Sequence, residues 1–163
     1  MPRFFIAVWP SAEVIDALER LVRPDEPGVR WTTRDQWHIT LRFLGAVDPG
    51  PVDDALRAVS ATPTDVTLGP RIERLGGSSV VVPVIGLDPV AAAVRVATAE
   101  IVDRPDDRPF VGHLTLGRRR DGGPTALDGH AFSSGFTVTE LALIRSDLHA
   151  DGARYTTLAT RSL

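Results

Sequence analysis

The chain contains no cysteine among its 163 residues. This absence excludes thiol nucleophiles, disulfide bonds and thiolate metal sites. Lysine is absent as well, because all 18 basic residues are arginine. The lack of lysine excludes the phosphate-binding lysine of a Walker loop, Schiff-base chemistry and any ligase that works through a lysyl-nucleotide intermediate. The arginines that remain carry a permanent charge on a planar fork that suits phosphate.

Long apolar runs and a strong net charge are also missing. No segment approaches the roughly 20 apolar residues that span a bilayer, and the N-terminal MPRFFIAVWP lacks the apolar run and cleavage site of a signal peptide. We therefore expect a cytoplasmic protein without a membrane contact. The net charge of −3 argues against a general nucleic-acid coat, so any contact with nucleic acid should be local and small.

The order of predicted elements indicates an α+β protein. Strands outnumber helices, and the mixed order favours largely antiparallel sheets. We expect two similar lobes with helices outside and an active-site cleft between them, forming a single bilobal domain over residues 1–163 in a monomer. Strands are expected at 3–9, 29–31, 37–44, 64–68, 79–85, 111–118, 136–145 and 154–160, and helices after Ser11 and at about 51–60 and 89–102.

One short pattern occurs twice, as WHITLRFLG at residues 37–45 and GHLTLGRRR at residues 112–120. Because side chains alternate across a strand, each copy should turn its histidine and threonine toward solvent, and the second copy should bury Leu114 and Leu116. The first copy should bury Ile39, Leu41 and Phe43. The polar side chains expected on the open faces are those of His38, Thr40, Arg42, His113 and Thr115.

This set of side chains suits a displacement at phosphorus. Two histidines with an ordinary pKa near ~6.5 can serve as a paired general acid and base at neutral pH. Threonine hydroxyls can hydrogen-bond phosphoryl oxygens, and arginine can balance their charge. Neither copy of the pattern carries a carboxylate that could complete a metal site, so we expect a site without metal or cofactor.

The paired motifs resemble those of the 2H phosphoesterase superfamily, specifically the RNA 2′,3′-cyclic phosphodiesterases also called 2′-5′ RNA ligases (LigT-like). The resemblance spans nearly the whole chain. It is carried by RFFIAVWP, by VRWTTRDQWHITLRFLG, by RPFVGHLTLGR and by the C-terminal SDLHADGARYTTL. One departure is Gly112, where the family usually has proline before the second histidine, and we expect this change to loosen the local backbone.

The resemblance implies both an activity and residue roles. The implied reaction is metal-independent hydrolysis of RNA or nucleoside 2′,3′-cyclic phosphate to the 2′-phosphate, with a reverse 2′-5′ RNA ligation as a side activity. Its implied partners are RNA ends or small nucleotides that carry a 2′,3′-cyclic phosphate. Carried over, His38 is the proton donor and His113 the proton acceptor. The predicted substrate-binding residues are Thr40, Thr115, Arg42 and Arg118, although alternation points Arg118 toward the core.

Two alternatives stay open at this point. The chain could be a nucleotide- or RNA-binding module without significant turnover, or a 2H phosphodiesterase for another cyclic phosphate or a 2′-5′ oligonucleotide. Intact histidines in both motifs favour an active enzyme over a binding module. The remaining candidates are expected to be structural or bystander residues, namely Trp31, Trp37, His130, His149 and Tyr155.

Overall fold

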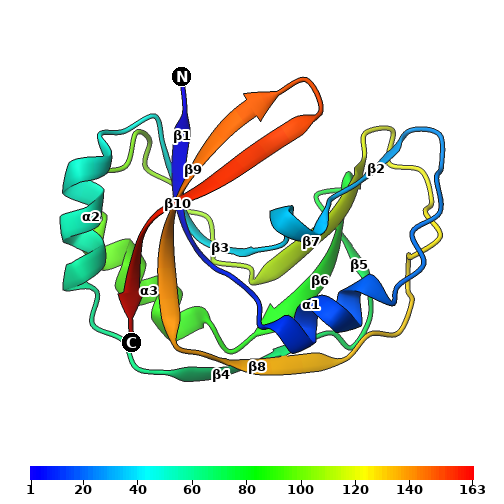
Figure 1. Cartoon of the computed structure of the whole chain (residues 1–163), viewed down its shortest axis with the longest axis horizontal. Coiled ribbons are helices and arrows are strands. Elements are labelled where there is room, and N and C mark those ends of the chain that lie inside the picture. Colours follow the sequence, from blue (N-terminus) through cyan, green and yellow to red (C-terminus); the bar gives the residue numbers. More distant parts are fainter.

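A computed structural model describes all residues, 1–163 (Figure 1). Its helices are α1 (Ala12–Glu19), α2 (Pro49–Ala58), α3 (Asp88–Ala97) and a short 3-10 helix (Arg34–Gln36). Its strands are β1 (Arg3–Val8), β2 (Val29–Trp31), β3 (Ile39–Gly45), β4 (Thr64–Leu68), β5 (Glu73–Leu75), β6 (Ser79–Ile85), β7 (His113–Arg119), β8 (Ser134–Val138), β9 (Glu140–His149) and β10 (Gly152–Ser162).

All ten strands belong to one sheet that curls into a half-barrel. The order β10-β9-β1-β3-β7-β6-β4-β8 places β3 and β7 at its centre, with β2 paired to β7 and β5 paired to β6. Every strand pairing is antiparallel. The predicted α+β class with antiparallel strands is therefore confirmed. Strand β2 pairs with β7 and not with β3, the next strand in the sequence.

Helices α1 and α2 begin where a side chain caps their first turn. Ser11 accepts a hydrogen bond from the backbone N–H of Val14, and α1 then buries Val14 and Leu18 completely. Asp48 accepts from the N–H of Gly50, so α2 begins at Pro49, two residues before the start that the apolar pattern predicts. No helix in the structure has the length and apolarity needed to cross a membrane.

The main core contains 29 buried residues drawn from both halves of the sheet. A second, smaller cluster comprises Phe5, Ala7, Ala142 and Ile144, with Trp9 and Tyr155 packed against it. Because side chains alternate along β1, Phe4, Ile6 and Val8 enter the main core, whereas Phe5 and Ala7 enter the small cluster. The small cluster lies beside the first motif and supports it.

A β-bulge interrupts β3 one residue after the motif threonine. Thr40 lies opposite Ala7 and Arg42 lies opposite Ile6, so Leu41 has no partner on β1. An inserted residue reverses the alternation of the side chains that follow it, here Arg42 and Phe43, until a second shift at Leu44. Phe43 is consequently 68% exposed, and the prediction that it belongs to the core is wrong.

β7 has an equivalent bulge at the same place in the second motif. Thr115 lies opposite Val81 and Gly117 lies opposite Val80, so Leu116 is the residue without a partner. The reversal turns Arg118 toward the face of Thr115, the side opposite to that expected from simple alternation. Phe43 and Arg118 therefore occupy equivalent positions, three residues after the two motif threonines.

Candidate active site

The two motifs lie on neighbouring, antiparallel strands at the centre of the sheet. Ile39 and Leu114, the middle residues of the two His-x-Thr units, lie directly opposite in the antiparallel β3–β7 pair, and both are completely buried. Their flanking histidines and threonines line one cleft of about 1000 Å³. The two motifs thus lie side by side in one continuous sheet, and this strand pair forms the base of the cleft.

His38 is held by hydrogen bonds at both ring nitrogens. Its Nδ1 lies 2.7 Å from the carbonyl oxygen of Gln36, and its Nε2 lies 3.0 Å from the hydroxyl of Thr40. A carbonyl oxygen only accepts, so Nδ1 carries the hydrogen and Nε2 is the nitrogen left able to take up or release a proton. Thr40 therefore occupies the position from which it can orient the reactive nitrogen.

Three aromatic rings surround His38. Its centroid lies 4.9 Å from that of Phe5, 5.0 Å from that of Tyr155 and 6.1 Å from that of Trp9. This burial lowers the pKa of His38 below its ordinary value, and a positive charge on His113 lowers that pKa further, while the Gln36 carbonyl opposes both effects. The imidazole of His38 is thus favoured in its neutral form in the unliganded protein.

His113 has a more open environment. Its Nδ1 lies 2.7 Å from the carbonyl oxygen of Val111, which fixes the same tautomer and leaves Nε2 available to a ligand. No aromatic ring packs against it as Phe5 and Tyr155 pack against His38. The two imidazoles thus share one hydrogen-bonding pattern at Nδ1 and differ in their burial.

Gly112 brings β7 close to β6 just before this histidine. A Cβ at position 112 would lie 2.3 Å from the carbonyl oxygen of Val84, and the Gly112 carbonyl accepts from the Val84 N–H at 2.9 Å. This glycine thus permits a close strand contact that a side chain would crowd, and the expected loosening of the backbone stays a prediction.

Thr32 ties the segment before the first motif to the second motif strand. Its hydroxyl is 2.9 Å from the carbonyl oxygens of Thr115 and Leu116, and it accepts from the indole Nε1 of Trp37 at 3.1 Å. Trp37 is 1% exposed, as expected for a core residue. This network fixes Thr115 at the base of the cleft.

The two arginines predicted to contact substrate lie in different places. Arg118 lines the cleft, and its charge opposes the burial that raises the pKa of Tyr155. Arg42 does not line the cleft, because the bulge at Leu41 turns it to the other side of β3. Its half-buried guanidinium lies near Arg95 and has an Nε without a partner, so the placement of Arg42 on the open face is wrong.

Two aromatic residues of the cleft are not assigned to it by the sequence pattern. Phe43 lies beside Phe5, with ring centroids 5.9 Å apart, and Tyr155 meets both Phe5 and His38 nearly edge-on. Only the bulge brings Phe43 to the cleft, so strict alternation could not have found it. Tyr155 is the single tyrosine of the chain. The spacing of two that places it on one face of the terminal strand with Ala153 and Thr157 is the signal in the sequence that could have indicated its position.

The rim of the cleft carries charges of both signs. Arg3, Arg104 and Arg108 are the basic residues, and Asp103 and Asp106 are the acidic ones. Arg108 holds the pKa of Asp106 well below its usual range through hydrogen bonds to its carboxylate. No group of three or more histidine, aspartate or glutamate side chains in the molecule is arranged to hold a metal ion.

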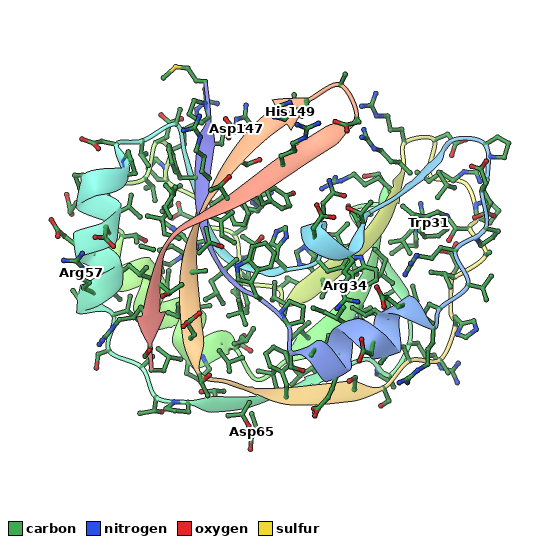
Figure 2. All side chains as sticks on the ribbon, viewed as in Figure 1. Trp31, Arg34, Arg57, Asp65, Asp147 and His149 are labelled. Carbon is green, nitrogen blue, oxygen red and sulfur yellow. The ribbon has the colours of Figure 1, made fainter.

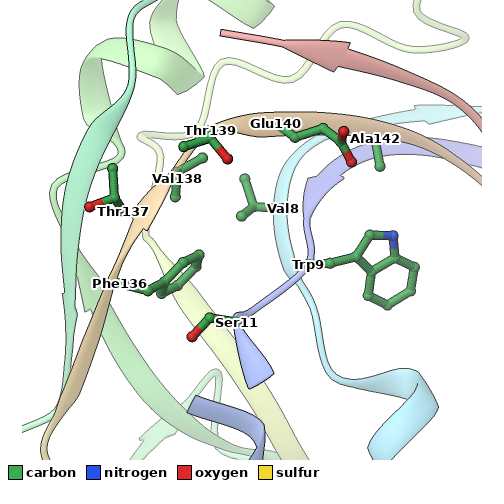
Figure 3. Close-up of a pocket in the computed structure, with 9 residues that line it drawn as sticks. All are labelled: Val8, Trp9, Ser11, Phe136, Thr137, Val138, Thr139, Glu140 and Ala142. Carbon is green, nitrogen blue, oxygen red and sulfur yellow. The ribbon is translucent and has the colours of Figure 1, made fainter. Parts of the chain in front are cut away.

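A second cavity of about 290 Å³ lies at the other end of β1, against the turn between β8 and β9 (Figure 3). Glu140 is the one titratable residue in its lining, so it offers no acid–base pair. Trp9 lines this cavity and donates a hydrogen bond from Nε1 to Thr157. His130 and His149 line neither cavity.

The sequence matches known proteins over most of its length. Residues 8–69 match the family model described as "LigT like Phosphoesterase". An RNA 2′,3′-cyclic phosphodiesterase from Geobacillus stearothermophilus is 30% identical over 179 residues, an alignment that covers 96% of this chain. The chain spans 55% of the length of that relative.

Solved structures match the whole fold. The crystal structure of TT0787 of Thermus thermophilus superposes with a TM-score of 0.84 at 26% identity, covering 99% of this chain and 97% of that one. E. coli LigT complexed with 3′-AMP superposes with a TM-score of 0.83 at 25% identity, covering 100% and 99%. Other crystals of E. coli LigT hold NADP+ or ATP.

Proposed function

Because this chain belongs to the LigT-like 2H phosphoesterase family and is homologous to an RNA 2′,3′-cyclic phosphodiesterase, we propose that it opens the 2′,3′-cyclic phosphate of RNA ends or nucleosides to give the 2′-phosphate. The observation that carries this proposal is the pairing of the two His-x-Thr units, in which Ile39 lies opposite Leu114. Because of this pairing, two imidazoles and two hydroxyls line the same cleft.

The proposed reaction is a displacement at phosphorus by water. Nε2 of His113 takes a proton from the water as its oxygen bonds to phosphorus. The bond between phosphorus and the 3′ oxygen then breaks, and Nε2–H of His38 gives its proton to that oxygen. One water is consumed, and the product carries a 2′-phosphate and a 3′-hydroxyl.

Three further side chains are suited to hold the phosphate during this step. The hydroxyls of Thr40 and Thr115 can donate to the non-bridging oxygens, and Arg118 offers a charge that balances the negative charge accumulating on them. The exposed ring of Phe43 offers a face on which a base can stack. The nucleotides bound by E. coli LigT are consistent with a nucleotide-sized ligand in this cleft.

The activity is tested by incubating the pure protein in EDTA with 2′,3′-cyclic nucleotides, 3′,5′-cyclic nucleotides and an oligoribonucleotide that ends in a 2′,3′-cyclic phosphate. We expect turnover of the 2′,3′-cyclic compounds alone, with 2′-phosphate products in ³¹P NMR. Binding without turnover would contradict the proposal, as would a 3′-phosphate product. Loss of activity in EDTA that a divalent ion restores would contradict the mechanism of two histidines.

A further inference from the structure

Beside the cleft, two arginines face each other across the pair formed by β2 and β7. Arg30 lies directly opposite Arg118 in this antiparallel pair. Directly opposite residues share one face of a sheet, so Arg30 lies on the face along which Arg118 lines the cleft. Both arginines are exposed to solvent. A second positive charge, that of Arg30, therefore lies beside Arg118 just beyond the residues that line the cleft.

The position of β2 on β7 is fixed by the next residue pair. Trp31 lies opposite Gly117, and a Cβ at position 117 would come within 2.6 Å of the Trp31 ring. The indole Nε1 of Trp31 donates to the carbonyl oxygen of Pro24 at 2.7 Å. Since the ring occupies the space that a side chain at 117 would need, the register that pairs Arg30 with Arg118 is well determined.

Neither arginine of this pair has an acidic partner. The nearby carboxylates are already engaged, because Asp121 pairs with Arg119 and Asp151 pairs with Arg154. Like charges directly opposite each other on neighbouring strands destabilise a sheet. An anion bound between Arg30 and Arg118 would remove that cost, and nothing in the protein itself supplies one.

The guanidinium of Arg30 also has a defined location. A Cβ on Gly152 would lie 2.6 Å from its Nη2, so Arg30 lies against the backbone where β10 begins. Gln36, a residue of the cleft, donates from Nε2 to the carbonyl oxygen of Ala153 at 2.8 Å in the same strand. Arg30 therefore lies between the second motif strand and the start of β10, and β2, which carries it, runs beside β7 (Figure 1).

We propose that Arg30, which lies beside Arg118 at the edge of the cleft, binds the phosphodiester that precedes the terminal nucleotide of an RNA strand, so that this protein prefers an RNA end over a free cyclic nucleotide. The inference rests on the proposed function and adds its substrate class. In it, the terminal cyclic phosphate lies at His38 and His113, and the strand leaves the cleft over Arg118 and then Arg30. Such a contact is local, as the net charge of −3 requires.

The test compares kcat/KM for a cyclic mononucleotide with kcat/KM for a triribonucleotide that has the same terminal nucleotide and cyclic phosphate. We expect the wild type to favour the triribonucleotide. In Arg30→Gln, kcat/KM for the triribonucleotide should fall roughly tenfold, mainly through KM, and that for the mononucleotide should fall far less. For the longer substrate, the slope of log(kcat/KM) against log of the salt concentration should become shallower by about one unit, as expected for the loss of one phosphate contact.

Arg57→Gln is the matched control. Arg57 lies on α2, far from Trp31 and β2 (Figure 2), and removing its charge should leave the preference unchanged. Arg30→Lys keeps the charge and should retain most of the preference, which separates charge from packing against Gly152. Melting curves identify any variant that fails to fold, and Arg30→Lys then decides the outcome: loss of the preference in a folded Arg30→Lys would overturn the inference.

Other outcomes divide the two proposals. No turnover of either substrate would contradict the proposed function itself. Turnover of both with equal kcat/KM in the wild type would overturn the RNA inference alone. An equal loss on both substrates in Arg30→Gln would also overturn it, as would competition by an acidic peptide that matches competition by an unmodified oligoribonucleotide.

Discussion

The same four-residue pattern, His-x-Thr-Leu, lies in two different surroundings in this molecule. The first copy places His38 among Phe5, Trp9 and Tyr155 with Nε2 bonded to Thr40. The second copy fixes only Nδ1 of His113, through the carbonyl of Val111. The backbone geometry is shared, down to a bulge after each threonine, whereas the environment of the imidazole is not.

This difference shows how one fold can place two identical side chains in unlike surroundings, and burial lowers the pKa of His38. Burial favours neutral His38, yet the proposed donor must be protonated when the leaving oxygen departs. A phosphate anion in the cleft favours imidazolium, so binding of the substrate itself would move His38 toward its donor form. The proposed donor role of His38 therefore depends on the ligand.

The largest effect is expected from removing either imidazole. His38→Ala and His113→Ala should each lose at least ~10²-fold in kcat on a 2′,3′-cyclic nucleotide, because each removes a general acid or base. Steady-state kinetics on folded protein, verified by circular dichroism, measure this loss. His130→Ala and His149→Ala are the controls and should be close to silent. A rate near that of the wild type in either motif variant would contradict the assignment of the site.

An intermediate effect should separate the two roles. An aryl phosphodiester has a leaving oxygen that needs no proton, so it should restore the activity of His38→Ala more than that of His113→Ala. The measured quantity is the ratio of kcat/KM for the aryl and the cyclic substrate in each variant. Equal restoration would reject the donor and acceptor roles and leave the two-histidine site standing, and a reversed order would exchange the roles.

The smallest effect concerns stability and tests the burial of His38. Its pKa is lower in the folded than in the unfolded chain, where it is ~6.5. Between these two values the unfolded chain binds the additional proton, so the free energy of unfolding decreases as the pH falls through this window and is fully retained above it. In His38→Gln this contribution disappears.

Melting temperatures measured from about pH 7.5 down to about pH 5 check this sign, since the window of His38 begins near its ordinary pKa of ~6.5. The wild type should lose a few degrees more than His38→Gln over this range, and His149→Gln should follow the wild type. A steeper pH dependence in His38→Gln than in the wild type would show that the folded state favours the protonated imidazole of His38, contrary to its burial.

Much of this arrangement could be predicted from local sequence. Strands β2, β4 and β6 have the bounds that composition and alternation indicated. The shared polar face of His38 and Thr40, and that of His113 and Thr115, also follows from the period of two, because the bulges come only after the threonines. The helix start after Ser11 could also be predicted, because a cap needs only one local hydrogen bond, here from the N–H of Val14 to the Ser11 hydroxyl.

The rest depended on contacts between distant segments. A bulge is decided by how two strands pair, so nothing within LRFLG or LGRRR reports that Leu41 or Leu116 has no partner. That one inserted residue exchanged the expected faces of Arg42 and Phe43. Likewise, the closeness of Gly112 to Val84 depends on β6, which lies elsewhere in the sequence.

The direct pairing of β3 with β7 has a consequence for how catalysis would begin. The two motifs are neighbours in one sheet and share the main core. The distance between the two imidazoles is therefore set by the pairing of two strands, and no hinge motion is needed to bring them together. Moving them apart would mean breaking the centre of the sheet. The reorganisation that many enzymes undergo on binding is therefore largely completed during folding, and a ligand meets both groups already in place.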